Sequence, residues 1–245
     1  MGELIAVLSG KGGTGKTSLC AGLATALAAS GEQVLCIDCD IGLRNLDISL
    51  GMTESGALSF TDVCAGDYDL SQAAVHPDFP TLRFLTAPIG CDADAVDGEA
   101  FAGMLRKARK RFHYIFLDAP AGVDTGFRLC ARHADRVLLV TGADPASVRD
   151  ATRAGQLLER MGKRSVKLIV NRVSEKLYGT VGITVDDVMD TAGMPLLGIV
   201  PEDPNVVLAA AFEKPLLRYT KKGAAAACSR IAKRIQGLPV PISTR

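Results

Sequence analysis

The chain of 245 residues carries almost no net charge and has no long apolar run. Its formal net charge of +1 excludes an overall electrostatic attraction to nucleic acid. No apolar run approaches the roughly 18 residues that a transmembrane helix needs. The first residues begin a strand almost at once and lack the layout of a signal peptide. We therefore expect a cytoplasmic protein.

Histidine and cysteine patterns typical of metal sites are also missing. His76, His113 and His133 are isolated in the sequence, which favours positions at the surface or at helix ends. The one C-x-x-C, Cys36 and Cys39, lies in the apolar run VLCIDCD, where an extended strand points the two side chains to opposite faces. We expect buried, unpaired thiols at the seven cysteines, which are Cys20, Cys36, Cys39, Cys64, Cys91, Cys130 and Cys228.

The chain does show an alternation of short apolar runs with helical stretches. The seven runs are LIAVLS, QVLCID, LRFLTA, YIFLDA, RVLLVT, VKLIVN and PLLGIV. Runs that are apolar on both faces indicate strands covered by helices on both sides. The pattern predicts an α/β fold with a doubly wound, mostly parallel sheet. No linker divides the chain, so we expect one domain over residues 1–236 and a short irregular tail over 237–245.

The first apolar run ends in a glycine-rich stretch that matches a phosphate-binding loop. Residues 10–17, GKGGTGKT, fit the pattern G-x-x-x-x-G-K-[ST] between a strand and a helix. Glycines let backbone N–H groups turn inward around phosphate oxygens, and the following helix points its positive end at the same anion. We expect Lys16 to offset phosphate charge and the Thr17 hydroxyl to bind Mg²⁺. The stretch therefore predicts a P-loop nucleotide site.

Two of the other apolar runs end in aspartates. In a doubly wound sheet, ligands bind at the carboxyl ends of the strands, where these aspartates would lie. Asp38 and Asp40 alternate at the end of the second run, and Asp118 ends the strand of YIFLDA. Carboxylates beside phosphates can hold metal-bound water or orient an attacking water, and an aspartate at the end of an apolar strand is the Walker B pattern. A helix cap or a surface turn is the alternative for each one. Their common position beside a P-loop favours the metal and water roles.

The additional lysine of the loop, Lys11, and four longer motifs resemble one family of ATPases. In KGGTGKT, Lys11 is similar to the signature lysine of the deviant Walker A family. The segments IDCDIGLRNLDISLG, DAPAGVDTGF, SVRDATR and GIVPEDPNVVLAA resemble its MinD branch, and the resemblance extends from residue 3 to about residue 236. It implies a P-loop ATPase that dimerises with ATP and acts as a switch in placing the division septum.

The resemblance also implies roles for the residues around the phosphates. Lys11 crosses a dimer interface in this family and contacts the phosphate of the partner's nucleotide, which makes dimerisation depend on ATP. By the same resemblance Asp38 supports the water shell of Mg²⁺, Asp40 positions the attacking water, and Asp118 is the metal-side carboxylate of the second switch. The residues expected to wrap the phosphates are Gly10, Lys11, Gly12, Gly13, Thr14, Gly15, Lys16, Thr17 and Ser18.

By the same resemblance, the base of the nucleotide lies near two later segments. Asn171 and Arg172 follow the run VKLIV and should meet the adenine. An amide such as that of Asn171 can both donate to and accept from an adenine edge. The base and ribose should be flanked by Pro201, Glu202 and Asp203.

The family resemblance extends to cofactors and partners. ATP and Mg²⁺ are the implied cofactors, and a homodimer formed with ATP is the implied assembly. Asn45 should lie in the first switch segment and Asp150, in SVRDATR, near the dimer interface. A MinE-like activator and a MinC-like division inhibitor are the implied partners, and no specific nucleic acid is expected.

The alternatives are other members of the same family. A ParA-type partition ATPase associated with nucleic acid would show a basic surface and a different segment after Asp-x-Asp, and IGLRNLD disfavours it. Another cell-positioning relative of MinD is the second alternative. We interpret the basic run RKARKR, residues 106–111, as the solvated end of a helix. A cluster-carrying relative would need a cysteine just beyond Asp118 or a C-terminal C-x-x-C, and the sequence has neither.

The C-terminal segment departs from the family pattern of a short amphipathic membrane-binding helix. GAAAACSRIAKRIQG predicts a final helix that packs on the domain through Ala224, Cys228, Ile231 and Ile235. Gly237 should end it, and the prolines of LPVPISTR exclude a further helix. We therefore expect weak membrane association, with at most an electrostatic contact to anionic lipid at the inner face of the cell membrane. That contact would use Arg230, Lys233 and Arg234.

Overall fold

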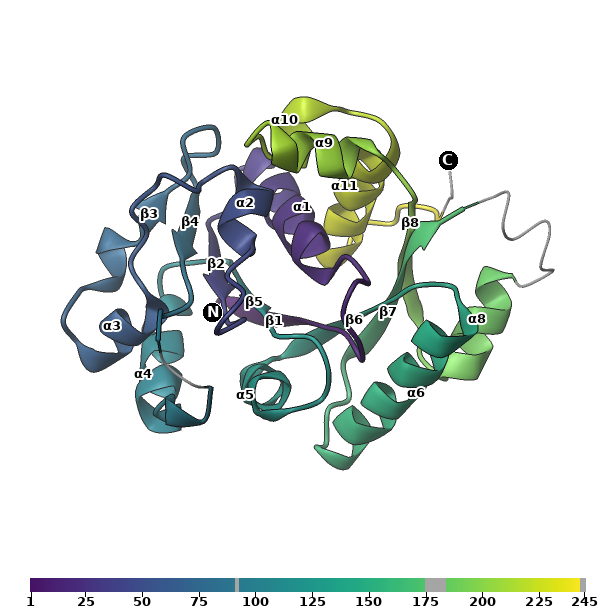
Figure 1. Cartoon of the computed structure of the whole chain (residues 1–245), viewed down its shortest axis with the longest axis horizontal. Helices are drawn as coiled ribbons and strands as arrows, with labels where there is room; N and C mark the ends of the chain where they lie inside the picture. The colour runs from purple at the N-terminus through teal and green to yellow at the C-terminus, as the bar shows by residue number, and fades with distance from the viewer. Residues whose placement is uncertain (91–92, 175–183, 243–245) are drawn as a thin grey trace.

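The computed structural model describes residues 1–90, 93–174 and 184–242. Its centre is an eight-stranded sheet with the order β3-β4-β2-β5-β1-β6-β7-β8 (Figure 1). Neighbouring strands are parallel except for β3, which is antiparallel to β4. The strands are β1 Glu3–Leu8, β2 Val34–Asp38, β3 Ala74–Val75, β4 Leu82–Leu85, β5 Tyr114–Asp118, β6 Arg136–Thr141, β7 Val166–Val173 and β8 Leu196–Pro201. The doubly wound, mostly parallel sheet is thereby confirmed.

The apolar runs form strands because both of their faces are buried. Along β1, Leu4, Ala6 and Leu8 pack into one hydrophobic cluster, whereas Ile5 and Val7 pack into the other. This alternation follows from the period of two in an extended strand. All seven predicted strands are present. The short strand β3 was not predicted, because two residues at the edge of the sheet leave no apolar pattern.

Helices cover both faces of the sheet (Figure 1). The first face carries α1 Lys16–Ala29, α2 Leu46–Leu50, α9 Asn205–Ala211, α10 Leu216–Tyr219 and α11 Gly223–Ile235. The second face carries α3 Phe60–Ala65, α4 Gly98–Ala108, α5 Thr125–His133, α6 Pro145–Arg160 and α8 Val185–Ala192. Short 3₁₀ turns lie at Leu70–Gln72 and Ala93–Ala95. The right-handed crossovers of parallel strands require this division of helices between the faces.

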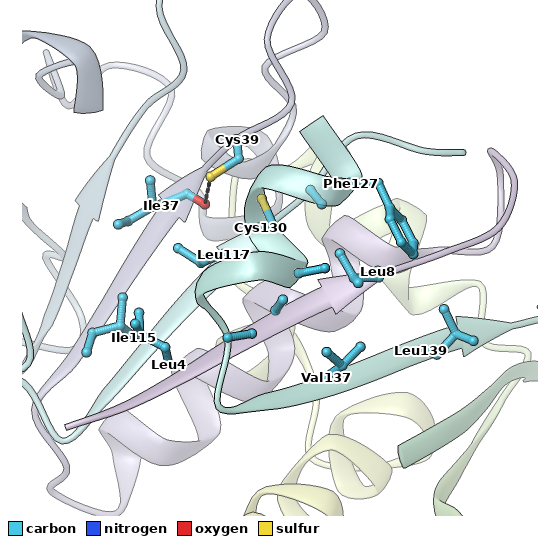
Figure 2. Packing of buried hydrophobic residues seen from close by; sticks show 14 of the residues in the cluster. Leu4, Leu8, Ile37, Cys39, Ile115, Leu117, Phe127, Cys130, Val137 and Leu139 are labelled. Atoms are coloured by element: carbon cyan, nitrogen blue, oxygen red, sulfur yellow. Dashed lines mark hydrogen bonds between the residues drawn. The ribbon is translucent and has the colours of Figure 1, made fainter. Parts of the chain in front are cut away.

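Five of the six described cysteines are free and buried as predicted, whereas Cys64 is free but only half-buried. Cys36 packs into the cluster with α1 and Cys39 into the opposite one, so the C-x-x-C pair does not share a face. Figure 2 shows Cys39 and Cys130 among the apolar side chains around α5. Cys91 lies outside the described residues. The cysteines found free are Cys20, Cys36, Cys39, Cys130 and Cys228, all buried, and Cys64, which is half-buried.

One histidine contradicts the expectation of a surface or helix-end position. His76 is 1% exposed, and its ring bridges two backbone groups. Nε2 lies 2.9 Å from the carbonyl oxygen of Leu50, and the amide of Asp78 donates to Nδ1 at 3.0 Å. The bond to Leu50 joins residues 26 positions apart, and neither bond belongs to a recognisable motif. The sequence alone therefore does not predict that His76 is buried. His113 is exposed and His133 lies in the last turn of α5, as predicted.

The last helix packs on the sheet as predicted. Ala224, Cys228, Ile231 and Ile235 are buried, and a Cβ on Gly198 of β8 would lie 2.4 Å from Ile231. This glycine therefore allows α11 to approach β8 closely. Arg234, one of the three basic residues predicted to face lipid, makes hydrogen bonds within the protein.

Arg234 is instead bound to the backbone of β8 and of the tail. Its guanidinium donates to the carbonyl oxygens of Leu197 at 3.0 Å and Val240 at 2.8 Å, and to that of Pro241. Its Nε and both Nη atoms thus donate hydrogen bonds within the protein.

The basic run, residues 106–111, lies at the end of α4 as predicted. The helix ends at Ala108, and two arginines after it form ion pairs. Arg109 lies 2.7 Å from Asp135 and Arg111 lies 3.0 Å from Asp69. Among the described residues, no helix is both long and apolar enough to cross a membrane.

Candidate nucleotide-binding site

Three adjacent strands bring the predicted phosphate and metal residues together. β1 lies between β5 and β6, and β5 lies between β1 and β2. Asp38 of β2 is the register partner of Asp118 of β5, which also pairs with Val7 of β1. The loop that follows β1, residues 9–15, therefore leaves the sheet directly beside the two carboxylates.

The glycines of this loop are required by backbone geometry and by close contacts. Gly13 and Gly15 have φ values of 79° and 81°, which side chains with a Cβ rarely adopt. A Cβ on Gly15 would lie 2.4 Å from Nδ2 of Asn171, and one on Gly10 would lie 2.4 Å from the carbonyl oxygen of Asp150. No side chain caps the start of α1 at Gly15. The first amides of α1 are therefore available to an anion.

Lys16 and Asp118 form a buried ion pair at the centre of the site. Nζ lies 2.7 Å from Oδ1, and the two side chains are 6% and 1% exposed. Burial acts to lower the pKa of Lys16, but the adjacent Asp118 carboxylate outweighs this effect and raises the pKa above its usual value. Lys16 is therefore a fixed positive charge at the start of α1.

Two buried polar atoms beside this pair have no hydrogen-bond partner in the described structure, Oδ2 of Asp118 and Oγ1 of Thr14. Burying an acceptor or a hydroxyl without a partner is costly, so such atoms indicate a missing ligand. The Thr17 hydroxyl lies 3.3 Å from Nζ of Lys16, on the same side of the loop. Asp118 and Thr17 together supply the hard oxygen donors that suit Mg²⁺. The residues present thus fit a phosphate with a magnesium ion.

Asp38 supports the segment that leads into α2. Its Oδ1 accepts from the amide of Asp40 at 2.9 Å, and its Oδ2 accepts from the amide of Leu46 at 3.2 Å. Burial, followed by the negative charge of Asp118, raises the pKa of Asp38 to about 7. Burial also raises the pKa of the half-buried Asp40, although Lys16 opposes this shift. The segment between β2 and α2 is therefore tied to the charges of the site.

The residues predicted at the base contact the loop itself. A register shift between Val170 and Val173 interrupts the pairing of β7 with β8. Asn171 donates from Nδ2 to the carbonyl oxygen of Thr14 at 2.8 Å, so its amide orientation is set by the loop. Arg172 has a φ of 58° and donates to the carbonyl oxygen of Gly13 at 3.3 Å.

A cavity of about 270 Å³ opens beside these residues. Its polar lining comprises Gly15, Ser18, Asn171, Arg172, Glu202 and Asp203. Its apolar lining comprises Leu19, Val200, Pro204, Val206, Val207, Leu216, Ala224 and Cys228. Pro201 is not part of the lining. Flat apolar walls with a few polar groups are typical of nucleobase sites. Val200, Pro204, Val206 and Val207 lie in the motif GIVPEDPNVVLAA. The other apolar members follow ordinary helix patterns, and no motif marks them.

Asp203 lines the cavity, but its carboxylate has a structural task. Oδ1 accepts from the amide of Asn205 at 2.9 Å and from its side chain at 2.7 Å. Oδ2 accepts from the amide of Ala224 at 2.9 Å, at the start of α11. Asp203 therefore holds the cavity wall and the last helix together. A cap that reaches across 21 residues leaves no local sequence signal.

Lys11 takes a different direction from Lys16. Its side chain is 37% exposed, and Nζ lies 3.4 Å from Oδ1 of Asp144, at the start of α6. Asn45 precedes α2 and is exposed, whereas Asp150 lies in α6 on the opposite face, 3.9 Å from Arg153. The structure therefore does not bring these two residues together within one protomer.

The buried Lys16–Asp118 pair, the loop glycines with positive φ and the partly exposed Lys11 define a P-loop nucleotide-binding protein of the deviant Walker A class. Comparison with known families agrees, because the model of the CobQ/CobB/MinD/ParA nucleotide binding domain matches residues 5–216. The septum site-determining protein MinD of Synechocystis sp. is 36% identical over 244 residues, which are 98% of this chain and 92% of that protein. The chain belongs to the MinD family of septum site-determining proteins.

Solved structures agree with this assignment. MinD from the MinC:MinD cell division protein complex of Aquifex aeolicus is 34% identical, with a TM-score of 0.91 over 98% of both chains. MinD of Pyrococcus horikoshii, solved with Mg-ADP, is 27% identical, with a TM-score of 0.80 over 96% of both chains. The family therefore binds nucleotide with magnesium on this fold.

Proposed function

We propose that this chain is a MinD-like ATPase that hydrolyses ATP, dimerises with ATP and acts as a switch in division-site placement. The observation that carries the proposal is the buried Lys16–Asp118 pair with an unsatisfied carboxylate oxygen, in a chain of the MinD family. A buried lysine whose charge is fixed at the start of a helix suits a nucleotide phosphate.

The roles of the site residues follow from their positions. Backbone amides of residues 10–15, Lys16 and Ser18 would bind and orient the phosphates. Thr17, Asp38 and Asp118 would hold Mg²⁺, which when bound offsets negative charge on the phosphate oxygens. Asp40, half-buried near Lys16, would orient the attacking water. The base would occupy the cavity beside Asn171, Arg172 and Glu202.

The second lysine suits a different task. Lys11 is partly exposed and is not among the residues that line the cavity of its own protomer. We infer that it contacts the phosphate of a second copy, with Asn45 and Asp150 at or near the same interface. Two nucleotides between two protomers concentrate negative charge, and a lysine from each side would offset it.

We infer partners and location from the same family. MinD of Aquifex aeolicus is solved in a complex with MinC, which supports a MinC-like division inhibitor as a partner of this chain. A MinE-like activator and a cytoplasmic location with weak peripheral attachment to the inner face of the cell membrane complete the proposal. The ATPase domain would comprise residues 1–236, with 237–245 as a tail.

One experiment tests the proposal as a whole. The ATP hydrolysis rate is measured with and without anionic vesicles and a candidate activator, and the mass of the protein is followed by light scattering with ATP and with ADP. We expect dimers with ATP and monomers with ADP. We also expect the activator to raise the rate of ATP hydrolysis. A monomer in every nucleotide state, or salt-dependent DNA binding that stimulates hydrolysis, would contradict the division-site switch and favour a partition ATPase.

A further inference from the structure

The contact of Lys11 with Asp144 couples the P-loop to helix α6. Nζ lies 3.4 Å from Oδ1, and the side chains are 37% and 55% exposed. The loop backbone is held separately, because Oγ of Ser9 donates to the carbonyl oxygen of Lys11 at 3.0 Å and Gly10 packs on the carbonyl of Asp150. The side chain of Lys11 can therefore move while its backbone stays in place.

Asp144 has a second task that does not need Lys11. It is the N-cap of α6, where Oδ1 accepts from the amide of Ser147 at 3.0 Å and the Ser147 hydroxyl donates to Oδ2. Partial burial acts to raise the pKa of Asp144, but the Ser147 bonds and the charge of Lys11 lower it below its usual value. The carboxylate that faces Lys11 is thus charged at neutral pH and fixed in place by the helix.

We propose that Asp144 is a positioning residue that holds Lys11 in the free protomer and releases it to the nucleotide phosphate of a second copy. The inference rests on the proposed function, because it takes the ATP-dependent dimer as the second state. An exposed ion pair is weak, so its loss corresponds to about 1.4- to 5-fold in an equilibrium constant. A phosphate that carries several negative charges and excludes water is a stronger partner for the same lysine.

The holding contact would therefore act against dimerisation without preventing it. Each dimer requires that two Lys11–Asp144 pairs be broken, so the effect is squared, to about 2- to 30-fold. It would also keep Lys11 away from a nucleotide in its own protomer. When the dimer forms, Lys11 would leave Asp144, the N-cap residue of α6.

Asp144→Asn tests the proposal, because asparagine is as good an N-cap as aspartate but carries no charge. The matched control is Asp97→Asn, since Asp97 caps α4 through the amides of Glu99 and Ala100 and makes no ion pair within the described residues. Dimer formation is measured by light scattering over a protein titration with Mg-ATP. We expect Asp144→Asn to dimerise at about 2- to 30-fold lower protein concentration than the wild type, and Asp97→Asn to match the wild type.

Labelling of Lys11 by an amine-reactive reagent, followed by mass spectrometry, gives a readout that a helix cap alone would not change. Without nucleotide, Lys11 should be labelled faster in Asp144→Asn than in the wild type, because Nζ is no longer held against the Asp144 carboxylate. With Mg-ATP, labelling should fall in both proteins. The difference between them should shrink as salt is added.

The outcomes separate the two proposals. If the wild type does not dimerise with Mg-ATP, the proposed switch fails and the inference fails with it. If the wild type dimerises but Asp144→Asn dimerises no better than Asp97→Asn, only the inference fails. Unchanged labelling of Lys11 in the free Asp144→Asn variant would equally overturn it.

Discussion

Within the P-loop, the two lysines differ in what surrounds them. Lys16 is 6% exposed and pairs with a buried carboxylate, whereas Lys11 is 37% exposed and pairs with a solvated one. Charge in a buried site interacts far more strongly than charge at the surface, so the two side chains cannot replace each other. The structure therefore places the two lysines in different surroundings, as the proposed division of roles between them requires.

This separation can be tested by two substitutions. Lys16→Ala should abolish Mg-ATP binding, whereas Lys11→Ala should bind ATP but remain a monomer. Isothermal titration measures binding, and gel filtration with ATP and Mg²⁺ measures assembly. A normal ATP dimer of Lys11→Ala would contradict the assignment. Lys16→Ala also leaves Asp118 buried without its partner, at a cost of about 3–5 kcal/mol, so Lys16→Gln is the second variant if the first does not fold.

Asp40 gives a prediction about turnover. It is half-buried beside the Lys16–Asp118 pair, and neither Thr17 nor Asp118 depends on it for a hydrogen bond. Asp40→Ala should therefore keep ATP binding and dimerisation but lose about 10²- to 10⁴-fold in the hydrolysis rate, because the attacking water is no longer oriented. Steady-state phosphate release and light scattering measure the two effects. Turnover equal to that of the wild type would show that Asp40 does not act on the water.

Between neighbouring elements, His76 fixes α2 to the strand β3 and the turn that follows it. Its Nδ1 accepts from the amide of Asp78, so the ring must be neutral and Nε2 must carry the proton that is shared with Leu50. The ring also lies edge-on to Phe79, with centroids 5.0 Å apart, and Arg218 lies over the same phenyl ring. Asp38 bonds to the first turn of α2 and His76 to its last residue, so the helix is held at both ends.

This contact predicts a pH dependence of stability. Burial lowers the pKa of His76, although the bond to Leu50 and the charge of Asp78 oppose the shift. A depressed histidine pKa means that the unfolded chain binds the proton more readily. The contribution of His76 is therefore fully present above the unfolded pKa of about 6.5 and is lost as the pH falls below it.

Urea unfolding at pH 7.5 and at pH 5.5 measures this effect. The free energy of unfolding of the wild type should fall further between the two pH values than that of His76→Gln. His113→Gln is the comparison variant, because His113 is exposed and its ring contacts the side chain of Glu32 instead of buried backbone groups. Equal pH dependence in the wild type and in His76→Gln would show that the buried ring does not titrate with unfolding.

The sequence predicts the elements that a local pattern specifies. Apolar runs identify seven strands because each has both faces buried, and Gly10 to Thr17 identify the loop because phosphate binding needs those residues in that order. Contacts between distant residues leave no such pattern. Three contacts are of this kind: the hydrogen bonds of His76 to Leu50 and of Ala224 to Asp203, and the ion pair of Lys11 with Asp144. An Asp-Pro at the start of a helix does predict the cap at Asp144, but not the lysine it meets.

At the scale of the whole molecule, the strand order concentrates the charged residues at one edge of the sheet. β2, β5, β1 and β7 end at the same edge, so the residues proposed to bind phosphate, metal and base meet there although they span positions 10 to 203. The opposite edge carries structural ion pairs, such as Arg136 with Glu3 at 2.9 Å. The C-terminal residues leave from α11, whose apolar face is already buried against β8.

That arrangement predicts weak binding to membranes. An interfacial helix needs a free apolar face and basic residues beside it, but the face of α11 is used by the fold and Arg234 is bound to the tail. Leu238 and Ile242 are about half exposed, at 50% and 45%, on a segment interrupted by prolines. Among the basic residues of α11, Lys233 is exposed in the last turn and can face anionic lipid.

Vesicle co-sedimentation measures this binding. The protein with ATP and Mg²⁺ should pellet poorly with anionic vesicles, and the small bound fraction should vanish with neutral vesicles or at about 1 M salt, where the Debye length is near 3 Å. Lys233→Gln should lower that fraction further, whereas Lys110→Gln, at an exposed position two residues beyond the end of α4, should leave it unchanged. Strong, salt-resistant and ATP-dependent pelleting would show that dimerisation exposes an apolar surface which the protomer keeps buried.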